Sequence, residues 1–257
     1  MAADKKELYS VQTVTKALDL IDLLSEVEGY LTLPHLAERL DLNRNKVYRL
    51  LVTLEGRGIV ERDDISGGYR LGIASVEMAQ KIMKNANIVN HAHPIMEELA
   101  KRHDEAVYLT VLKGDEVMFL DMVDCEQNIK AAPLIGHRFP FFTNASGMAM
   151  KALESRDILE RLFKRRKKAE GLPDLAELES QLDAIREKGV AVNEGGLGDG
   201  IISVAVAIRD YAGKVVGALT ILGPSFRMLA DRLESEIIPS ILEEGAMLSE
   251  KFGYARG

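Results

Sequence analysis

Residues 31–71 constrain the fold of this chain more than any other stretch, because helix, turn and strand signals follow one another there without a break. Apolar residues recur at helical spacing over residues 32–40 and 44–54, and Asn43 between them is a preferred helix N-cap residue. Residues 59–60 and 69–71 then read as short strands on either side of a glycine-containing turn. Two short helices followed by a hairpin predict a winged helix-turn-helix.

The second of these helices carries polar side chains of the kind that read DNA. A helix in the major groove needs short or forked polar groups near its N-terminus for base edges, and cations for phosphates. Arg44, Asn45 and Lys46 supply the first, and Arg49 lies one turn further on. Between residues 43 and 62, five cations stand against two acids. A solvated helix face without a partner is the alternative, but the hairpin and the local charge together favour DNA binding.

The predicted DNA contacts divide into base reading and phosphate binding. We expect Asn45 and Lys46 to reach base edges and Arg49 to bind a phosphate. The residues predicted to contact double-stranded DNA are Thr32, Arg44, Asn45, Lys46, Tyr48, Arg49, Arg62 and Arg70.

Length and composition bound the class of protein. A chain of 257 residues can form two domains with separate cores, and a hydrophobic content of 47% excludes a disordered chain. The net charge of −7 argues against general coating of nucleic acid, so the positive charge for DNA must be local. Cys125 is the single cysteine and allows no internal disulfide. The N-terminus lacks a signal peptide's apolar core and no stretch approaches the ~20 apolar residues of a membrane span, so we expect a cytoplasmic protein.

The sequence pattern divides the chain into three parts. A first helix over residues 10–27 precedes the helix-turn-helix and wing, and the DNA-binding domain is predicted over residues 1–72. Residues 73–85 predict a linker helix, whose apolar positions Ile73, Val76 and Ile82 would be exposed on a monomer. We expect this helix to take part in dimerisation; the alternative is that it simply completes the first domain. A second domain is predicted over residues 86–257.

Strands and helices are mixed in the second domain. Strands are predicted over residues 106–112, 116–123, 129–133, 190–193, 201–209 and 214–222. Helices are predicted over residues 88–103, 145–153, 174–188 and 226–252. Asn144 and Asp174 are predicted N-caps, Gly189 ends the third of these helices, and Pro239 bends the last. Because neighbouring strands are joined by short turns, the predicted fold is α+β with an antiparallel sheet.

The order of sequence blocks along the chain resembles the IclR family of transcriptional regulators over essentially the whole length. The amino-terminal blocks are TVTKALDLIDLL, LPHLAERLDLNRNKVYRLLVTLEGRGIVER and GGYRLG. The carboxy-terminal blocks are GHRFPFFTNASGMAMKAL, LDAIREKGVAVNEGGLGDGIISVAVAIRD and GKVVGALTILGPSFRM. The resemblance implies a GAF-like second domain with a small-molecule cavity, and a homodimer or dimer of dimers that reads a pseudo-palindromic operator.

The resemblance also implies an effector site. The small residues Ala145, Ser146 and Gly147 form a turn at the start of a helix. Backbone N–H groups and the helix dipole at such a position favour a ligand carboxylate. The implied effector-binding residues are Ala145, Ser146, Gly147, Asn193, Ser203, Thr220 and Leu222. Met148 and Leu222 stand where some relatives have more polar residues, which implies an organic acid with an apolar body rather than glyoxylate. Ordinary core and turn positions are the alternative for all of these residues.

Other motifs give weaker signals for chemistry. The glycines of residues 195–200 feed a strand rather than a helix N-terminus, which argues against a phosphate loop and favours a loop over a pocket. His91 and His93 do not share a helix face, so no metal site is predicted, and no cofactor motif is present. The basic run over residues 164–168 is interpreted as a solvated helix end and loop.

The sequence therefore predicts a transcription factor whose second domain binds a small-molecule effector. One alternative is a DNA-binding regulator controlled by a protein partner without any small ligand. A remote alternative is a hydrolase that uses Ser146 or Cys125 as nucleophile, but Ser146 lacks the G-x-S-x-G frame and no base is placed near Cys125 by sequence.

Overall fold

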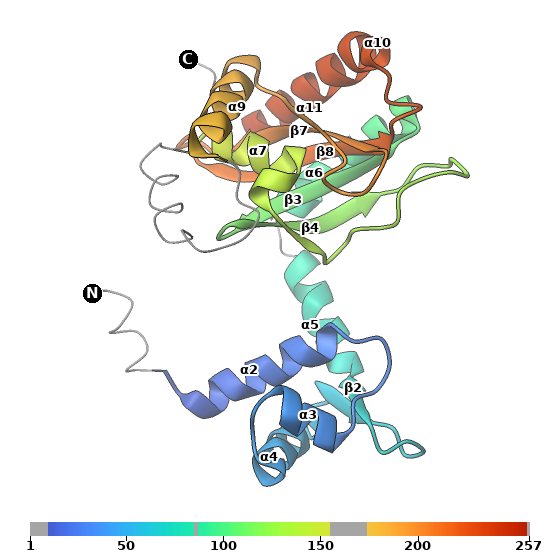
Figure 1. The fold of residues 1–257 in the computed structure, drawn as a ribbon, viewed down its shortest axis with the longest axis vertical. Coiled ribbons are helices and arrows are strands. Elements are labelled where there is room, and N and C mark those ends of the chain that lie inside the picture. The colour runs from blue at the N-terminus through green and yellow to red at the C-terminus, as the bar shows by residue number, and fades with distance from the viewer. Residues whose placement is uncertain (1–9, 85–86, 155–173, 256–257) are drawn as a thin grey trace. The chain divides into compact units, whose positions relative to one another are not determined.

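The computed structural model describes residues 10–84, 87–154 and 174–255. The chain forms two compact units, Met1–Asn85 and Ala86–Gly257, which are described separately (Figure 1). No helix in the described part of the chain is long and apolar enough to cross a membrane.

The first unit is a winged helix-turn-helix, as predicted. Its elements are α2 (Gln12–Ser25), α3 (Leu33–Arg39), α4 (Arg44–Glu55), β1 (Val60–Arg62), β2 (Tyr69–Leu71) and α5 (Ile73–Lys84). Leu20, Leu36, Val47 and Leu51 are fully buried between the helices, because the apolar stripes of α2, α3 and α4 face one another. Asp41 has a φ of 51° in the short turn between α3 and α4, a conformation that aspartate tolerates better than most residues.

The second unit is an α+β domain built on one antiparallel sheet. Its helices are α6 (Asn87–His103), α7 (Ala145–Ala152), α9 (Leu175–Lys188), α10 (Ala230–Arg232) and α11 (Ile238–Lys251), with a 3₁₀ turn η1 (Phe141–Thr143) and a π-helical turn η2 (Leu233–Ile237). Its strands are β3 (Ala106–Lys113), β4 (Glu116–Val123), β5 (Arg138–Pro140), β6 (Ala191–Glu194), β7 (Ile201–Arg209) and β8 (Val215–Pro224). They form a six-stranded sheet in the order β5-β4-β3-β8-β7-β6. The predicted fold class is confirmed.

The sheet separates two cores. On one face, α6 and α11 pack against apolar side chains such as Leu109, Val204 and Leu219. On the other face, α7 and α9 pack over a core that includes Phe119 and Leu222. Since strand residues alternate between faces, Thr220 lies on the same face as Leu222. The second face is therefore the one that carries the effector residues implied by the sequence.

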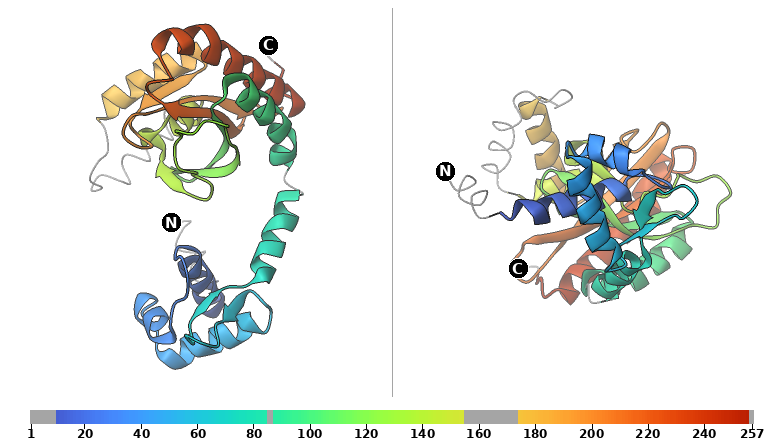
Figure 2. Two further views of the ribbon diagram at one scale, coloured as in Figure 1. Left: turned by 90° about the vertical axis from the view of Figure 1, so that its right-hand side faces the viewer. Right: turned by 90° about the horizontal axis from the view of Figure 1, so that it is seen from below.

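Two secondary-structure predictions in this unit were wrong. Residues 129–133 do not form a strand: the Ile129 carbonyl accepts a bond from the Arg227 guanidinium, Pro133 has no N–H to donate, and β5 pairs with β4 instead. The left view of Figure 2 shows the connection between β4 and β5 as a wide, light-green loop. The last helix begins at Ala230 rather than at Phe226, and the predicted bend at Pro239 is preceded by the π-helical turn η2.

Candidate nucleic-acid interface and effector site

The helix α4 turns its polar face outward. The Asn43 side chain caps it by accepting a bond of 2.8 Å from the Lys46 N–H. Because Val47 and Leu51 are buried on the inner side, the outer side carries a set of exposed polar residues. These are Arg44, Asn45, Lys46, Tyr48 and Arg49. All five belong to the predicted DNA-contacting set.

The polar side chains of α4 are not engaged by other groups in the described part of the chain. No hydrogen bond or ion pair there holds the side chains of Arg44, Lys46 or Arg49. A groove of about 800 Å³ runs between α2 and α4, and Lys16, Lys46 and Arg49 lie in its lining. Three cations thus border an open groove beside the outer face of α4.

The wing differs from α4 because its cations have partners within the protein. Arg70 pairs with Glu61 on the neighbouring strand, and its guanidinium lies 4.9 Å from the centre of the Tyr30 ring. The Glu61 carboxylate raises the pKa of Arg70. Arg62 lies 5.9 Å from the centre of the Tyr69 ring. Both arginines therefore lie on the hairpin, but each contacts another side chain of the same unit.

The wing tip carries negative charge and one apolar side chain. Asp63 accepts bonds from the Ser66 amide and hydroxyl, which lower the pKa of Asp63. Ile65 is 97% exposed at this tip. The remaining predicted DNA residue, Thr32, precedes α3, and its hydroxyl lies 3.2 Å from His35 Nδ1.

The N-terminus of α7 is buried and holds three of the predicted effector residues. Asn144 caps the helix by accepting a bond of 2.9 Å from the Gly147 N–H. Ala145 N–H lies 3.5 Å from the Ser203 hydroxyl on β7, and the Ser146 hydroxyl lies 2.7 Å from the Thr220 hydroxyl on β8. The structure therefore joins residues far apart in sequence at one end of α7.

The strand register brings the other predicted effector residues into the same place. Asn193 on β6 pairs with Ser203 on β7, which in turn pairs with Leu222 on β8. Residues directly opposite one another share a face of a sheet, so these three form a row across the sheet. Ser203 and Leu222 are buried, and Asn193 is half-buried.

The glycine-rich loop between β6 and β7 packs directly against the segment that leads into α7. Gly196 donates to the Asn193 side chain at 3.2 Å, and a Cβ at this position would lie 1.5 Å from the Thr143 carbonyl oxygen. Only glycine fits this approach. Because the glycines lead from a strand into a strand, the loop lacks the helix N-terminus that a phosphate loop requires.

Tyr108 was not among the sequence candidates, although it lies beside them. It is buried on β3 directly opposite Thr220, and its hydroxyl lies next to the Leu134 backbone. Burial raises the pKa of Tyr108 to about 12. The alternation of the strand over residues 106–112 could have placed Tyr108 on this face, but only the register identifies Thr220 as its neighbour.

The remaining candidates have structural surroundings that differ from a reactive site. Ser146 is fully buried and its hydroxyl meets a hydroxyl, not an imidazole. Cys125 is 7% exposed. His93 bonds to Asp121 at 2.7 Å, whereas His91 packs edge-on against Phe252. Among the described residues no cluster of metal-ligating side chains is found, and the basic run over residues 164–168 lies outside them.

A winged helix-turn-helix joined to a separate α+β unit is the architecture of a DNA-binding regulator. Residues 13–64 match the IclR helix-turn-helix domain, and residues 80–250 match the C-terminal domain of bacterial transcriptional regulators of the IclR type. The chain belongs to the IclR family of transcriptional regulators.

Named relatives and solved structures agree with this family. The HTH-type transcriptional regulator BhcR of Paracoccus denitrificans is 30% identical over 95% of this chain and 88% of its own length. The crystal structure of an IclR-type regulator from Alicyclobacillus acidocaldarius is 26% identical, covers 94% of this chain and 99% of that one, and superposes with a TM-score of 0.83. An IclR homologue from Microbacterium hydrocarbonoxydans, solved with 4-hydroxybenzoate, shares the fold with a TM-score of 0.79 at 20% identity over 95% of this chain and all of its own.

Proposed function

We propose that this regulator acts in the cytoplasm and that its binding to an operator is adjusted by a small organic acid bound at the N-terminus of α7. The observation that carries the proposal is the buried cluster formed by Ala145, Ser146, Ser203 and Thr220. Buried hydroxyls and a helix N-terminus on an otherwise apolar face are the groups that satisfy a buried carboxylate. The Asn193 and Leu222 side chains flank this cluster in the same row.

The chemistry of this face favours an acid with an apolar body. Leu222 and Met148 are buried in the same core as Tyr108 and Phe119, so a ligand that enters meets mainly hydrocarbon and aromatic surface beyond the hydroxyls. The same fold holds 4-hydroxybenzoate in the Microbacterium hydrocarbonoxydans homologue, an aromatic carboxylate of this kind.

On the DNA side, we assign α4 as the reading helix. Asn45 and Lys46, in its first turn, would contact base edges, and Arg49 would bind a phosphate. Arg44 and Tyr48 flank them, and Thr32, Arg62 and Arg70 would contact the backbone from α3 and the wing. The free cations of α4 support this division, because a side chain without an internal partner breaks no bond within the protein when it binds a phosphate.

Dimerisation through α5, the linker helix, would place two such units on a pseudo-palindrome. Ile73, Val76 and Ile82 are 66%, 50% and 63% exposed on α5. An apolar stripe at helical spacing is normally covered by a partner. A charged residue at Val76 would weaken self-association and operator binding together, and unchanged behaviour of Val76→Glu in both would argue against this role.

A thermal-shift screen of organic acids on the full chain tests the effector site. A ligand present at 100 times its dissociation constant adds about 2.7 kcal/mol to the free energy of unfolding. Ser146→Trp should fill the seat at the N-terminus of α7 and abolish this stabilisation, while operator binding stays measurable. Ser146→Ala is the matched control, because it removes the hydroxyl without adding volume. If Ser146→Trp binds the identified acid with unchanged calorimetric affinity, the site lies elsewhere.

A further inference from the structure

We propose that residues 124–137, which join β4 to β5, form a hinged cover over the proposed effector face, and that Arg227 is the residue that positions this cover. We call these residues the strap. The proposal rests on the function proposed for that face, but its geometry and its test do not require that the ligand be known.

The inner side of the strap belongs to the effector face. Ala131 and Leu134 pack against the core that contains Ala145, Met148 and Leu222. The Leu134 backbone lies next to the hydroxyl of Tyr108, and Tyr108 lies directly opposite Thr220 in the sheet. A ligand that reaches Thr220 from this side therefore meets the strap or displaces it.

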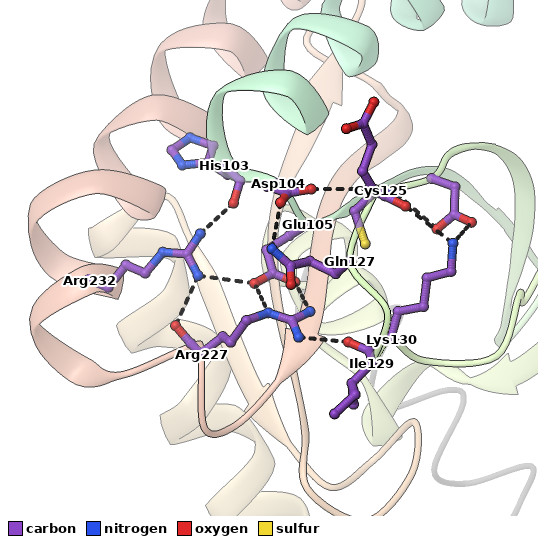
Figure 3. A network of polar contacts seen from close by, with 11 residues as sticks. His103, Asp104, Glu105, Cys125, Gln127, Ile129, Lys130, Arg227 and Arg232 are labelled. Carbon is purple, nitrogen blue, oxygen red and sulfur yellow. Dashed lines mark hydrogen bonds and ion pairs between the residues drawn. The ribbon is translucent and has the colours of Figure 1, made fainter.

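Arg227 ties the strap to a buried carboxylate. Glu105, which directly precedes β3 and is 1% exposed, accepts two bonds from Arg227: Nε to Oε1 at 2.8 Å and Nη2 to Oε2 at 2.7 Å. The third nitrogen of the same guanidinium, Nη1, donates to the Ile129 carbonyl at 2.6 Å (Figure 3). The rigid fork of arginine suits this double task, because its fixed nitrogens can bind a carboxylate and a carbonyl at the same time.

The groups around Glu105 make the anchor firm. Arg232 donates to Glu105 at 3.0 Å and also to the backbone carbonyls of Arg227 and His103. Gly223 on β8 leaves room for the carboxylate, since a Cβ there would lie 2.6 Å from Glu105 Oε2. Arg232 would still neutralise Glu105 if Arg227 were replaced, so the loss of Arg227 leaves no buried charge without a partner.

A second tie lies beside the first. Asp104 accepts bonds from the Glu126 amide at 3.1 Å and from the Gln127 side chain. Over residues 124–133, the ties that the structure describes to the rest of the unit come from the side chains of Arg227 and Asp104 rather than from a strand ladder. A segment held by a few side-chain bonds opens locally at lower cost than a strand within a sheet.

The single cysteine of the chain reports on the strap. Cys125 lies on it and is 7% exposed, so its thiol reacts with an aromatic disulfide reagent such as DTNB only when the strap opens. Arg227→Gln removes a charged anchor, and we expect the labelling rate at fixed pH to rise by roughly tenfold or more. Gln127→Ala, which removes one tie at the surface, should raise it by about threefold.

Arg102→Gln is the matched control. Arg102 on α6 binds Ser240 and the buried Glu244 of α11 on the other face of the sheet. Arg102→Gln therefore breaks a comparable arginine–glutamate ion pair that does not contact the strap. We expect Arg102→Gln to lower the stability of the unit but to leave Cys125 labelling within about twofold of wild type. Labelling should also be insensitive to low urea, as local opening is, whereas global unfolding accelerates with urea.

Equal labelling of Arg227→Gln and Arg102→Gln would overturn the proposal, as would labelling that follows global unfolding in urea. If Arg227→Gln does not fold, Arg227→Lys provides a second test of the Cys125 labelling rate. Lysine keeps a positive charge beside the Glu105 carboxylate but cannot also bind the Ile129 carbonyl, so the labelling rate should still rise. Wild-type labelling of both Arg227→Lys and Gln127→Ala would likewise overturn it. Failure to find an effector leaves these rates unchanged, so the two proposals fail separately.

Discussion

The helices α4 and α7 begin in the same way and lie in opposite surroundings. In each, an asparagine accepts a bond from the N–H of the third helical residue: Asn43 from Lys46 at 2.8 Å and Asn144 from Gly147 at 2.9 Å. Every residue of α7 is buried, whereas the first three residues of α4 are exposed. The same local chemistry therefore supports an outward polar face in one unit and an inward polar cluster in the other, and burial distinguishes the two.

The largest expected difference concerns the third helical residue. A Cβ at Gly147 would lie 2.2 Å from the Phe141 carbonyl oxygen, so we expect Gly147→Ala to lower the free energy of unfolding by about 3 kcal/mol. Lys46 occupies the same helical position in α4 but is exposed, so Lys46→Ala should change the free energy of unfolding by less than about 0.5 kcal/mol. Urea unfolding of both variants measures this difference. Similar values for the two would mean that α7 is not held against η1.

The two N-caps give the next largest difference. Asn144 is fully buried and also donates to the Pro140 carbonyl at 3.0 Å, so Asn144→Ala leaves several buried groups without partners and should cost about 2–3 kcal/mol. Asn43→Ala should cost about 1 kcal/mol, because water can replace the lost cap. Asn43→Asp and Asn144→Asp serve as controls that keep the cap acceptor. A larger loss of unfolding free energy in Asn43→Ala than in Asn144→Ala would contradict this prediction.

Removal of a hydroxyl should give a smaller difference. Thr220→Val leaves the Ser146 hydroxyl buried without its partner at 2.7 Å, which should cost about 1–2 kcal/mol. Thr53→Val on α4 removes a hydroxyl that is exposed and bonds only to the Arg49 carbonyl, and should change stability by less than about 0.5 kcal/mol. Thermal unfolding compares the two, and the double variant with Ser146→Ala should recover part of the Thr220→Val loss. Additive losses would show that the hydroxyls do not depend on each other.

The smallest effect on unfolding is expected at Arg49, where the effect on DNA should be clear. Arg49→Ala removes an exposed cation without an internal partner, so stability should stay within about 0.5 kcal/mol of wild type. Binding should weaken alike for all DNA sequences, and the salt dependence should flatten by about one unit of slope. Arg70→Ala, which also breaks the pair with Glu61, should weaken DNA binding less than Arg49→Ala. A change only in the preferred sequence would refute the assignment of Arg49 to a phosphate.

Local signals predicted much of the secondary structure, because caps and turns act within a few residues. Asn43, Asn144 and Asp174 cap the helices they were expected to cap, and Gly189 ends α9 with a φ of 75°. The hairpins of β3 with β4 and of β7 with β8 follow from alternation and from turns that contain glycine. These features depend on neighbours in sequence, so a single chain is sufficient to read them.

The failures come from contacts between distant residues. The sequence of residues 129–133 is typical of a strand, but the Ile129 carbonyl accepts a hydrogen bond from the Arg227 guanidinium, which is 98 residues away in the sequence. The ties between Glu105, Arg227 and Arg232 were not foreseen, because arginines on a turn and at the start of a helix give no sequence signal for a buried carboxylate. The DNA-contact and effector residues remain predictions; the structure adds that the effector residues lie together and that the wing arginines have internal partners.

The sequence by itself determined where the hairpins and most of the helices lie, and the family resemblance singled out Ser146 and Thr220 as site candidates. It could not determine that their hydroxyls meet, because the pair is 74 residues apart and depends on the packing of α7 over β8. Nor could it determine that the cap of α4 faces water while the cap of α7 faces the core. Propensity and capping are local energies, whereas burial and register are set only when the whole sheet and both of its cores are assembled.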